Sequence, residues 1–397
     1  MAFFKNRYKP VSEWKKRLLT DVDKELAHHG SGGLMNEIYQ LIEKLAATSG
    51  QFASLLQDPL LDSLLFNKKN DLIKKLTATD FSKISTVYLG AHLVHARSMS
   101  EDVHFVHLAS DFLHKPPANI PKGAVFILLN NDIGKDLPAY IDFYNKNPQA
   151  LFVIWDWDSQ HWLQMSALCA IHCDVYISAS SETVFALSHF NPCVIGPVFA
   201  CVHQWSRTFV LNNLELLLSE RADGPFGMHV HYEKYARRNR AIASVMQHFP
   251  TVAFANNDFK GRSDLENLKE WGAYKTHWIM PVLGGVPIRV YNALLTGGIP
   301  ILPAFYQNMP EVAYLGTSPL YYDLNGLVEP HEIAKSAISV FNENGENGLI
   351  QRVLDGLARH HADTRCNDIL LRVQRAVDGI LRNDYAFHDS YLSTYHA

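Results

Sequence analysis

The chain has 397 residues, of which 47% are hydrophobic and 19% charged, values typical of a globular protein of about two domains. Its net charge of -4 argues against a dedicated nucleic-acid-binding protein. No apolar run reaches the length of a membrane span, and the first residues lack the hydrophobic core of a signal peptide. We therefore expect a cytoplasmic protein.

The N-terminus differs from the rest of the chain in its charge. Basic residues outnumber acidic ones there, and four aromatic residues lie among them: Phe3, Phe4, Tyr8 and Trp14. Such a segment suits the anionic surface of a membrane, and it equally suits a solvated basic tail. Helical periodicity follows over residues 11–82.

From Thr86 onward the pattern changes to short apolar runs separated by helical or loop segments. The predicted strands of this half are 87–89, 103–108, 125–129, 151–155, 175–178 and 194–195. This alternation indicates an open parallel α/β sheet, and ligands of such sheets bind at the carboxyl ends of the strands.

Acidic residues follow the fourth of these strands, in the sequence WDWDSQHW. In an extended chain, Asp156 and Asp158 share one side, and His161 lies close behind them. These are candidates for acid–base chemistry. Alternatively, Asp158 or Ser159 caps the helix that comes next.

A second α/β series begins near Pro225, after a predicted linking helix over 205–220. Its predicted strands are 226–232, 252–255, 277–280, 299–302 and 320–322. A helix over 233–248 carries Arg237 and Arg238. Asp223 lies at the connection between the two halves, where it either faces the cleft or simply forms a turn.

The stretch from Lys275 to Glu311 contains one charge between its end residues, that of Arg289. It predicts a strand, the loop Gly284-Gly285, a helix, a second glycine turn and another strand. Helical spacing places Arg289, Asn292 and Thr296 on one face. This face and the helix N-terminus suit an anion; the alternative is a core helix whose arginine pairs with a distant acid.

Two such halves, with the run PIRVYNALLTGGIPILP in the second, resemble a glycosyltransferase of the GT-B architecture. With the WDWDSQHW segment and the chain length, the closest resemblance is to the retaining β-Kdo transferase module of WbbB-type lipopolysaccharide O-antigen synthases. The resemblance implies two Rossmann-like lobes facing a cleft. We expect an N-terminal, acceptor-side lobe over 1–203, a donor-side lobe over 204–367, and a C-terminal helix over 368–397 that docks across the lobes.

The same resemblance implies a donor, CMP-β-Kdo, and an acceptor, a lipid-linked glycan at the inner face of the bacterial cytoplasmic membrane. It implies no metal cofactor, because cations and helix dipoles stabilise the leaving phosphate. Asp156 and Asp158 also form the Asp-x-Asp pattern that binds metal in the other common glycosyltransferase fold, and we favour a catalytic role for them over a metal site. Retention through an aspartyl adduct would use Asp223 as nucleophile and Asp158, beside Asp156 and His161, as acid/base. The expected donor contacts beside Arg289 are Lys275, His277 and Arg238.

Other interpretations stay open at this stage. The chain suits a GT-B hexosyltransferase that uses a nucleoside diphosphate sugar, a sugar-nucleotide epimerase, or a glycan-binding module. It also suits one module of a longer synthase. The five scattered cysteines do not form a disulfide framework, so we expect buried free thiols.

Overall fold

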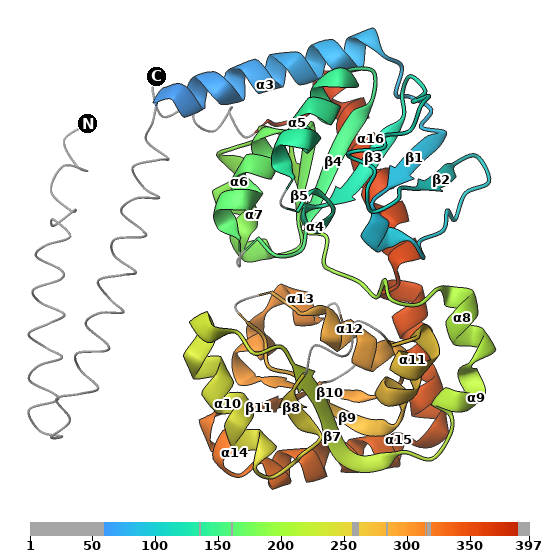
Figure 1. Ribbon diagram of the computed structural model, residues 1–397, viewed down its shortest axis with the longest axis vertical. Helices are drawn as coiled ribbons and strands as arrows, with labels where there is room; N and C mark the ends of the chain where they lie inside the picture. Colours follow the sequence, from blue (N-terminus) through green and yellow to red (C-terminus); the bar gives the residue numbers. More distant parts are fainter. Residues whose placement is uncertain are drawn as a thin grey trace, which may run out of the picture. The chain divides into compact units, whose positions relative to one another are not determined.

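The computed structural model describes residues 59–387, apart from 135, 160–161, 256–261, 283–284, 314 and 316–318. The basic N-terminus and most of the helical segment predicted over 11–82 therefore lie outside the described residues. Helix α3 (Pro59–Ala78) is the first described element. Figure 1 shows it in blue. Among the helices that are described, none has both the length and the apolar character needed to cross a membrane.

The first half of the chain forms a six-stranded sheet in which all strand pairs are parallel and the strand order is β2-β1-β3-β4-β5-β6. Its strands are β1 (Thr86–Leu89), β2 (His104–His107), β3 (Val125–Leu129), β4 (Leu151–Asp156), β5 (Val175–Ser178) and β6 (Val194–Ile195). Every residue of β3, β4 and β5 is buried, which explains why they read as continuous apolar runs.

The connections of this sheet are short helices. They are η1 (Ala91–Leu93), α4 (Asn130–Ile133), α5 (Leu137–Lys146), α6 (Leu163–Ile171) and α7 (Ser181–Ser188). Helix α3 contributes an ion pair at the amino end of β5. Its Lys75 donates to both carboxylate oxygens of Asp174 at 2.8 Å, and Asp174 precedes β5.

The linking segment contains two short helices, α8 (Arg207–Asn212) and α9 (Leu214–Leu217), where a single helix over 205–220 was predicted. The break falls at Asn213, whose φ of -114° and ψ of 21° are not helical. Side-chain hydrogen bonding of asparagine to nearby backbone favours such interruptions: Asn213 Nδ2 donates to the Phe209 carbonyl at 2.8 Å.

The second half forms a five-stranded parallel sheet in the order β11-β10-β9-β7-β8. Its strands are β7 (Ala222–His229), β8 (Val252–Phe254), β9 (Tyr274–Trp278), β10 (Ile299–Pro303) and β11 (Leu320–Tyr322). Its helices are η2 (Glu233–Tyr235), α10 (Ala236–Met246), α11 (Asp264–Gly272), α12 (Ile288–Leu295), η4 (Ala304–Asn308), α13 (Pro310–Ala313), α14 (Leu324–Val328) and α15 (Pro330–Arg359). The two parallel α/β lobes predicted from the sequence are therefore confirmed.

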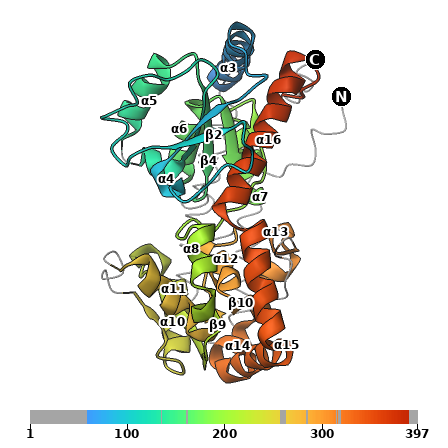
Figure 2. The ribbon, with the colours of Figure 1, turned by 90° about the vertical axis from the view of Figure 1, so that its right-hand side faces the viewer.

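The last helix, α16 (Ala362–Leu381), returns to the N-terminal lobe (Figures 1 and 2). It begins six residues before the predicted start at 368, because the side chain of His361 caps it by accepting from the Asp363 N–H. Its apolar side chains share one core with β1, β3, β4 and β5: Ile369, Leu370, Val373, Val377 and Ile380. All five cysteines are buried free thiols, as predicted.

Candidate active site

The C-terminal sheet changes direction between β7 and β9. From β7 the chain moves outward to β8, then returns past β7 to build β9, β10 and β11 on the other side. The loops after β7 and β9 therefore leave the sheet in opposite directions. They open a crevice at the carboxyl ends of these strands, which is where open α/β sheets bind their ligands.

Arg238 of α10 spans this crevice. Its Nη1 donates to the carbonyl of Val230 at 2.8 Å and its Nε to the carbonyl of Met280 at 3.3 Å. Val230 directly follows β7, and Met280 lies two residues beyond β9. Burial, the main cause, lowers the pKa of Arg238, but arginine keeps its charge at neutral pH. A fixed cation thus lies between β7 and β9, where the strand order reverses. We call this place the switch point of the sheet.

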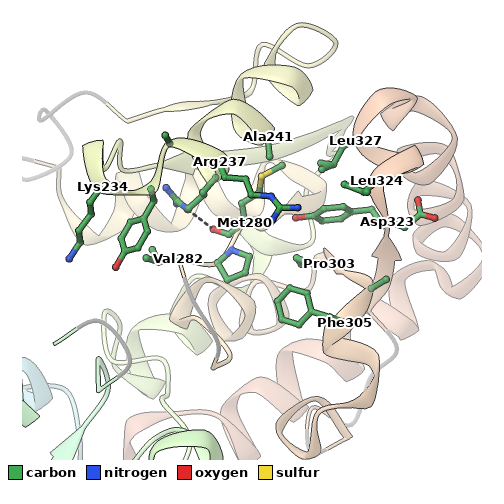
Figure 3. Close-up of a pocket in the computed structure, with 16 residues that line it drawn as sticks. Lys234, Arg237, Ala241, Met280, Val282, Pro303, Phe305, Asp323, Leu324 and Leu327 are labelled. Atoms are coloured by element: carbon green, nitrogen blue, oxygen red, sulfur yellow. Dashed lines mark hydrogen bonds between the residues drawn. The ribbon is translucent and has the colours of Figure 1, made fainter. Parts of the chain in front are cut away.

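A cavity of about 730 Å³ lies beside Arg238 at the same edge of the sheet. We call it the edge cavity, and Figure 3 shows its side chains. It is lined by Lys234, Tyr235, Ala236, Arg237, Arg238, Ala241, Met280, Pro281, Val282, Pro303, Ala304, Phe305, Tyr322, Asp323, Leu324 and Leu327.

The lining has a basic part, an apolar part and one acidic residue, Asp323. Lys234, Arg237 and Arg238 lie at or near the N-terminus of α10, whose backbone amides add positive potential. Met280 follows β9, Pro303 is the last residue of β10, and Phe305, which is 56% exposed, lies in η4. The arrangement suits a molecule with an apolar planar group and an anionic group beside it.

A second cavity, of about 530 Å³, lies between α11 and α12, and we call it the α12 cavity. Arg289 and Asn292 line it, together with Gln204 and Trp271. Among the described residues, no acidic side chain forms an ion pair with Arg289. Burial, followed by the charge of Arg238, lowers the pKa of Arg289 to about 10. Glu270 lines the same cavity and raises the pKa of Arg289, but its ion pair is with Arg262. The alternative of an arginine paired with a distant acid therefore finds a nearby carboxylate but no ion pair among the described residues.

Asn292 is buried, and its amide group is only half satisfied. Its Nδ2 donates to Gln204 Oε1 at 3.1 Å, whereas its Oδ1 has no partner among the described groups. The loop before α12 is only partly described, because Gly284 lies outside the described residues. Gly285 has a φ of 81°, which favours glycine, and its carbonyl accepts a hydrogen bond from Tyr306.

Two of the expected donor contacts lie in the core instead. His277 is fully buried, with its ring stacked on Trp271, and burial lowers its pKa to about 3. Thr296 is the C-cap of α12, and its hydroxyl donates back to the carbonyls of Asn292 and Ala293. Neither side chain reaches a cavity surface, which argues against their predicted role.

Lys275 and Asp223 form an ion pair with each other at the start of β9 and β7. This is the amino edge of the sheet, opposite the edge cavity. Asp223 is mainly solvent-exposed there rather than facing a cavity. The location argues against Asp223 as a nucleophile and against Lys275 as a donor contact, although their roles stay untested.

The WDWDSQHW segment follows β4 at the carboxyl edge of the N-terminal sheet. Asp156 is fully buried, accepts hydrogen bonds from Tyr176 and from the Asp158 N–H, and has its pKa raised by burial to about 6. It is enclosed by protein groups. Asp158 is half-buried and accepts from Asn131 Nδ2 at 3.1 Å. His161 lies outside the described residues.

The capping alternative for this segment is wrong. Helix α6 begins at Leu163, and its N-cap residue is Trp162 rather than Asp158 or Ser159. The hydroxyl of Ser159 instead lies 2.7 Å from that of Thr183 in a buried cluster. Asp158 therefore keeps a partly exposed carboxylate at the strand edge, and its acid/base role stays a prediction.

The N-terminal sheet has its own switch point, between β1 and β3, and sequence reasoning missed the residues there. His92 follows β1 and Asp132 follows β3, and His92 Nδ1 lies 2.6 Å from Asp132 Oδ1. A signal did exist in the sequence. Both residues come three positions after the last residue of a predicted strand, where polar residues are expected to meet.

The carboxyl edges of the two sheets are in contact. Lys234 Nζ, at the edge cavity, lies 4.6 Å from the ring centroid of Trp162, which follows β4. The backbone N–H of Ser181, after β5, donates to Oε1 of Glu311, after β10, at 3.0 Å. The two switch points therefore belong to edges that face each other.

Comparison with known proteins identifies no family. No protein-family model matches the chain, and no curated protein matches it. One similar solved structure is an α,α-trehalose-phosphate synthase (UDP-forming) from Burkholderia vietnamiensis, with 10% identity, 67% of this chain and 76% of that chain covered, and a TM-score of 0.41. Another is the catalytic domain of starch synthase IV from Arabidopsis thaliana bound to ADP and acarbose, with 9% identity, 65% and 73% coverage, and a TM-score of 0.38. These scores are too low to support an argument, so the assignment below rests on the site.

Proposed function

We propose that the protein is a glycosyltransferase of the GT-B type that takes its sugar from a nucleotide donor. The single observation that carries this proposal is Arg238, fixed across the switch point of the C-terminal sheet and lining the edge cavity. A ligand placed there meets a guanidinium, the N-terminus of α10 and an apolar wall together.

The edge cavity matches the parts of a nucleotide sugar. Met280, Pro303 and Phe305 offer apolar contacts to a nucleobase, and the basic wall faces the phosphate. Cations fixed beside a departing phosphate stabilise the charge that develops as the sugar–phosphate bond breaks. In this proposal the chain's own cations stabilise this developing charge. The expectation that no metal is needed stays a prediction.

Within this class, we propose Kdo as the transferred sugar, CMP-β-Kdo as the donor and a lipid-linked glycan as the acceptor. Arg289 supports this choice, because it forms no ion pair among the described residues, and Glu270, an acid on the same cavity, is paired with Arg262. A sugar acid would supply Arg289 with a carboxylate of its own. Double displacement through an aspartyl adduct stays part of the proposal. Asp158 is the partly exposed carboxylate at the facing edge, and Asp223 is the weaker candidate for reasons of position.

A hexosyltransferase that uses a nucleoside diphosphate sugar is the second candidate. Three basic side chains, those of Lys234, Arg237 and Arg238, line one wall of the edge cavity, and a diphosphate carries more charge than the single phosphate of a CMP-sugar. An epimerase would use the same cavity but would transfer no sugar to an acceptor. The choice of donor and the fate of the nucleotide separate these activities.

The test combines calorimetry with nucleotide release on a panel of CMP-β-Kdo, UDP-glucose, UDP-N-acetylglucosamine and GDP-mannose. One donor should bind to the wild-type protein, and Arg238→Ala should lose roughly 30-fold or more of that affinity, because truncating a fixed charge that contacts its partner costs about 2–5 kcal/mol. Arg238→Lys should recover little of the loss, since an ammonium cannot bridge both carbonyls in the same way.

The matched control is Arg240→Ala, because Arg240 is exposed on the same helix and lies outside the edge cavity. Circular dichroism checks that each variant folds. Equal donor affinity in folded Arg238→Ala and Arg240→Ala would refute the placement of the donor. Failure of every donor to bind the wild-type protein would refute the transferase itself.

A further inference from the structure

The amino edge of the C-terminal sheet gathers three cations around one aromatic ring. The guanidinium carbons of Arg352 and Arg221 lie 5.1 and 5.5 Å from the ring centroid of Phe341. Lys275 Nζ lies 6.0 Å from the same centroid. Arg221 directly precedes β7 and Lys275 lies in β9, whereas Arg352 comes from α15. Three segments that are distant in the sequence thus bring like charges together, and we call these three side chains the amino-edge cluster.

Backbone carbonyls hold both guanidinium groups in place. Arg221 donates to three carbonyls, and one of them, that of Thr296, lies 2.6 Å from its Nη2. Arg352 Nε donates to the carbonyl of the next residue, Gly297, at 2.8 Å. Both arginines are therefore bound to the C-terminal end of α12. A carbonyl satisfies an N–H group, but it cancels only a fraction of a positive charge.

The two arginines carry charges that the described residues leave uncompensated. Both side chains are buried, and neither forms an ion pair with an acidic side chain in the described part of the chain. Burial, followed by the charge of Arg352, lowers the pKa of Arg221 to about 10, and burial lowers that of Arg352 to about 10, so both stay charged at neutral pH. Arg221 Nε and Arg352 Nη2 also lack a hydrogen-bond partner among the described groups. Buried charges are ordinarily paired, because removing a charge from water is costly.

Among the described residues, Asp223 supplies the one carboxylate that pairs with this cluster, and it does so at the surface. Its ion pair with Lys275 joins a side chain that is 67% exposed to one that is 19% exposed. An exposed ion pair contributes little to stability, so another anion can replace this carboxylate at small cost. The cluster thus sets three positive charges against one weakly held negative charge.

We propose that the amino-edge cluster binds a phosphate-class anion, which takes the place of the Asp223 carboxylate beside Lys275. A phosphate group carries about 1.5 to 2 negative charges near pH 7 and has three acceptor oxygens, so it neutralises more of the cluster than a carboxylate does. Lys275 Nζ donates to the anion directly. The charges of Arg221 and Arg352 attract it from behind, where burial limits screening by salt.

This site is separate from the proposed donor site. It lies at the amino ends of β7 and β9, whereas the edge cavity lies at their carboxyl ends. The inference therefore stands or falls without reference to glycosyl transfer, and its test measures anion binding alone.

The experiment titrates inorganic phosphate, pyrophosphate and glycerol 3-phosphate into the wild-type protein by calorimetry, with sodium chloride keeping the ionic strength constant. Lys275→Met should weaken binding by at least about tenfold, the loss expected for one charge-assisted hydrogen bond. Lys335→Met is the matched control, because Lys335 is exposed on α15 and lies outside the cluster. It should keep the wild-type affinity.

Two further variants separate an anion site from a structural cluster. Asp223→Asn removes the carboxylate that competes for Lys275, so phosphate should bind about 1.5- to 5-fold more tightly. A purely structural ion pair gives no such gain. Arg352→Met should weaken binding by roughly 2- to 10-fold, because a charge behind the anion contributes less than a direct contact. If Arg352→Met fails to fold, the variants of the surface pair decide the question.

The outcomes either support this site or overturn it. Tighter binding of inorganic phosphate identifies the free anion as the ligand, and tighter binding of glycerol 3-phosphate identifies a phosphomonoester; both support the site. A wild-type protein that binds none of the three anions, or equal affinities in Lys275→Met and Lys335→Met, would overturn it. So would binding that is lost in Arg238→Ala and kept in Lys275→Met, because the anion would then lie in the edge cavity. Acetate binding as tight as that of phosphate would overturn the assignment to phosphate.

Discussion

The two sheets share one strand order up to their fifth strand, yet their switch points carry different chemistry. At the N-terminal switch point, between β1 and β3, a carboxylate and an imidazole are paired and no arginine spans the gap among the described residues. At the C-terminal switch point, between β7 and β9, Arg238 bridges two strand ends beside a cavity. One edge suits the transfer of a proton, and the other suits the binding of an anion.

The difference arises from the connection after the first strand of each sheet. After β1 the chain turns at once through Gly90 into η1, so His92 stays next to the strand end and meets Asp132. After β7 the chain runs through η2 before α10 begins, so Arg238 reaches back over the strand ends from a helix. A short connection brings a short side chain to the edge. A longer connection leaves a cavity that a long side chain crosses.

Arg289 offers the strongest test of whether the cations of the C-terminal edge act together. Arg289→Ala should weaken donor binding by about 2–5 kcal/mol, the cost of removing a charged partner from a desolvated site. Stability should change little, because Glu270, an acid that acts on Arg289, keeps its ion pair with Arg262. Calorimetry on the folded variant measures the first quantity and urea unfolding the second.

A double variant sharpens this comparison. After burial, the charge of Arg238 is the next cause that lowers the pKa of Arg289, so we expect the two guanidinium groups to lie within electrostatic range of each other. If both hold the same anion, the losses in Arg238→Ala and Arg289→Ala should not add in the double variant. If Arg289→Ala alone leaves the donor affinity unchanged, the α12 cavity is not part of the donor site.

Histidines of the two lobes should respond to pH in opposite directions. Burial lowers the pKa of His277 to about 3, so between this value and about pH 6.5 the unfolded chain binds a proton that the folded protein does not bind. Stability is therefore lost as the pH falls below about 6.5, by about 2 kcal/mol at pH 5 for one such histidine. His92, whose pKa is raised, contributes stability below its unfolded pKa and loses it as the pH rises through the folded one.

Urea unfolding at pH 7 and pH 5 measures the effect. His277→Leu removes the buried ring and should reduce the loss of stability between the two pH values, even if the variant is less stable at pH 7. His104→Leu, at an exposed position, should keep the wild-type difference. An identical difference in all three proteins would show that His277 does not titrate as its buried position requires.

Much of the fold was predictable because buried parallel strands appear in the sequence as apolar runs. The strands at 125–129, 175–178, 194–195 and 320–322 were predicted at their observed bounds. A C-terminal helix was also predicted, and α16 is that helix. Its start was missed because the cap is His361, a residue type outside the usual N-cap preferences.

The site was less predictable because its contacts join distant parts of the chain. His92 and Asp132 are 40 residues apart, and Arg238 meets Met280 across 42 residues. Such pairs follow from strand order, which apolar runs do not specify. Helical spacing did place Arg289 and Asn292 together on the α12 cavity, but it also grouped them with Thr296, whose hydroxyl is satisfied inside the helix.

The smallest effect is expected at the amino edge of the C-terminal sheet, where Asp223 pairs with Lys275. The carboxylate is mostly exposed, and exposed ion pairs contribute about 0.2–1 kcal/mol to stability. Asp223→Asn should therefore cost no more than this in urea unfolding, and nucleotide release should keep its wild-type rate. Asp158→Asn, at the carboxyl edge, is the matched variant for comparison.

Intact-protein mass spectrometry with donor and without acceptor decides between the two aspartates. A gain of one sugar mass that persists in Asp223→Asn and disappears in Asp158→Asn would place the adduct at the carboxyl edge, in keeping with the position of the edge cavity. A gain that disappears in Asp223→Asn would contradict the comparison of the two edges. The donor would then have to reach the amino edge of the sheet, and the ion pair with Lys275 would have to open to expose the nucleophile.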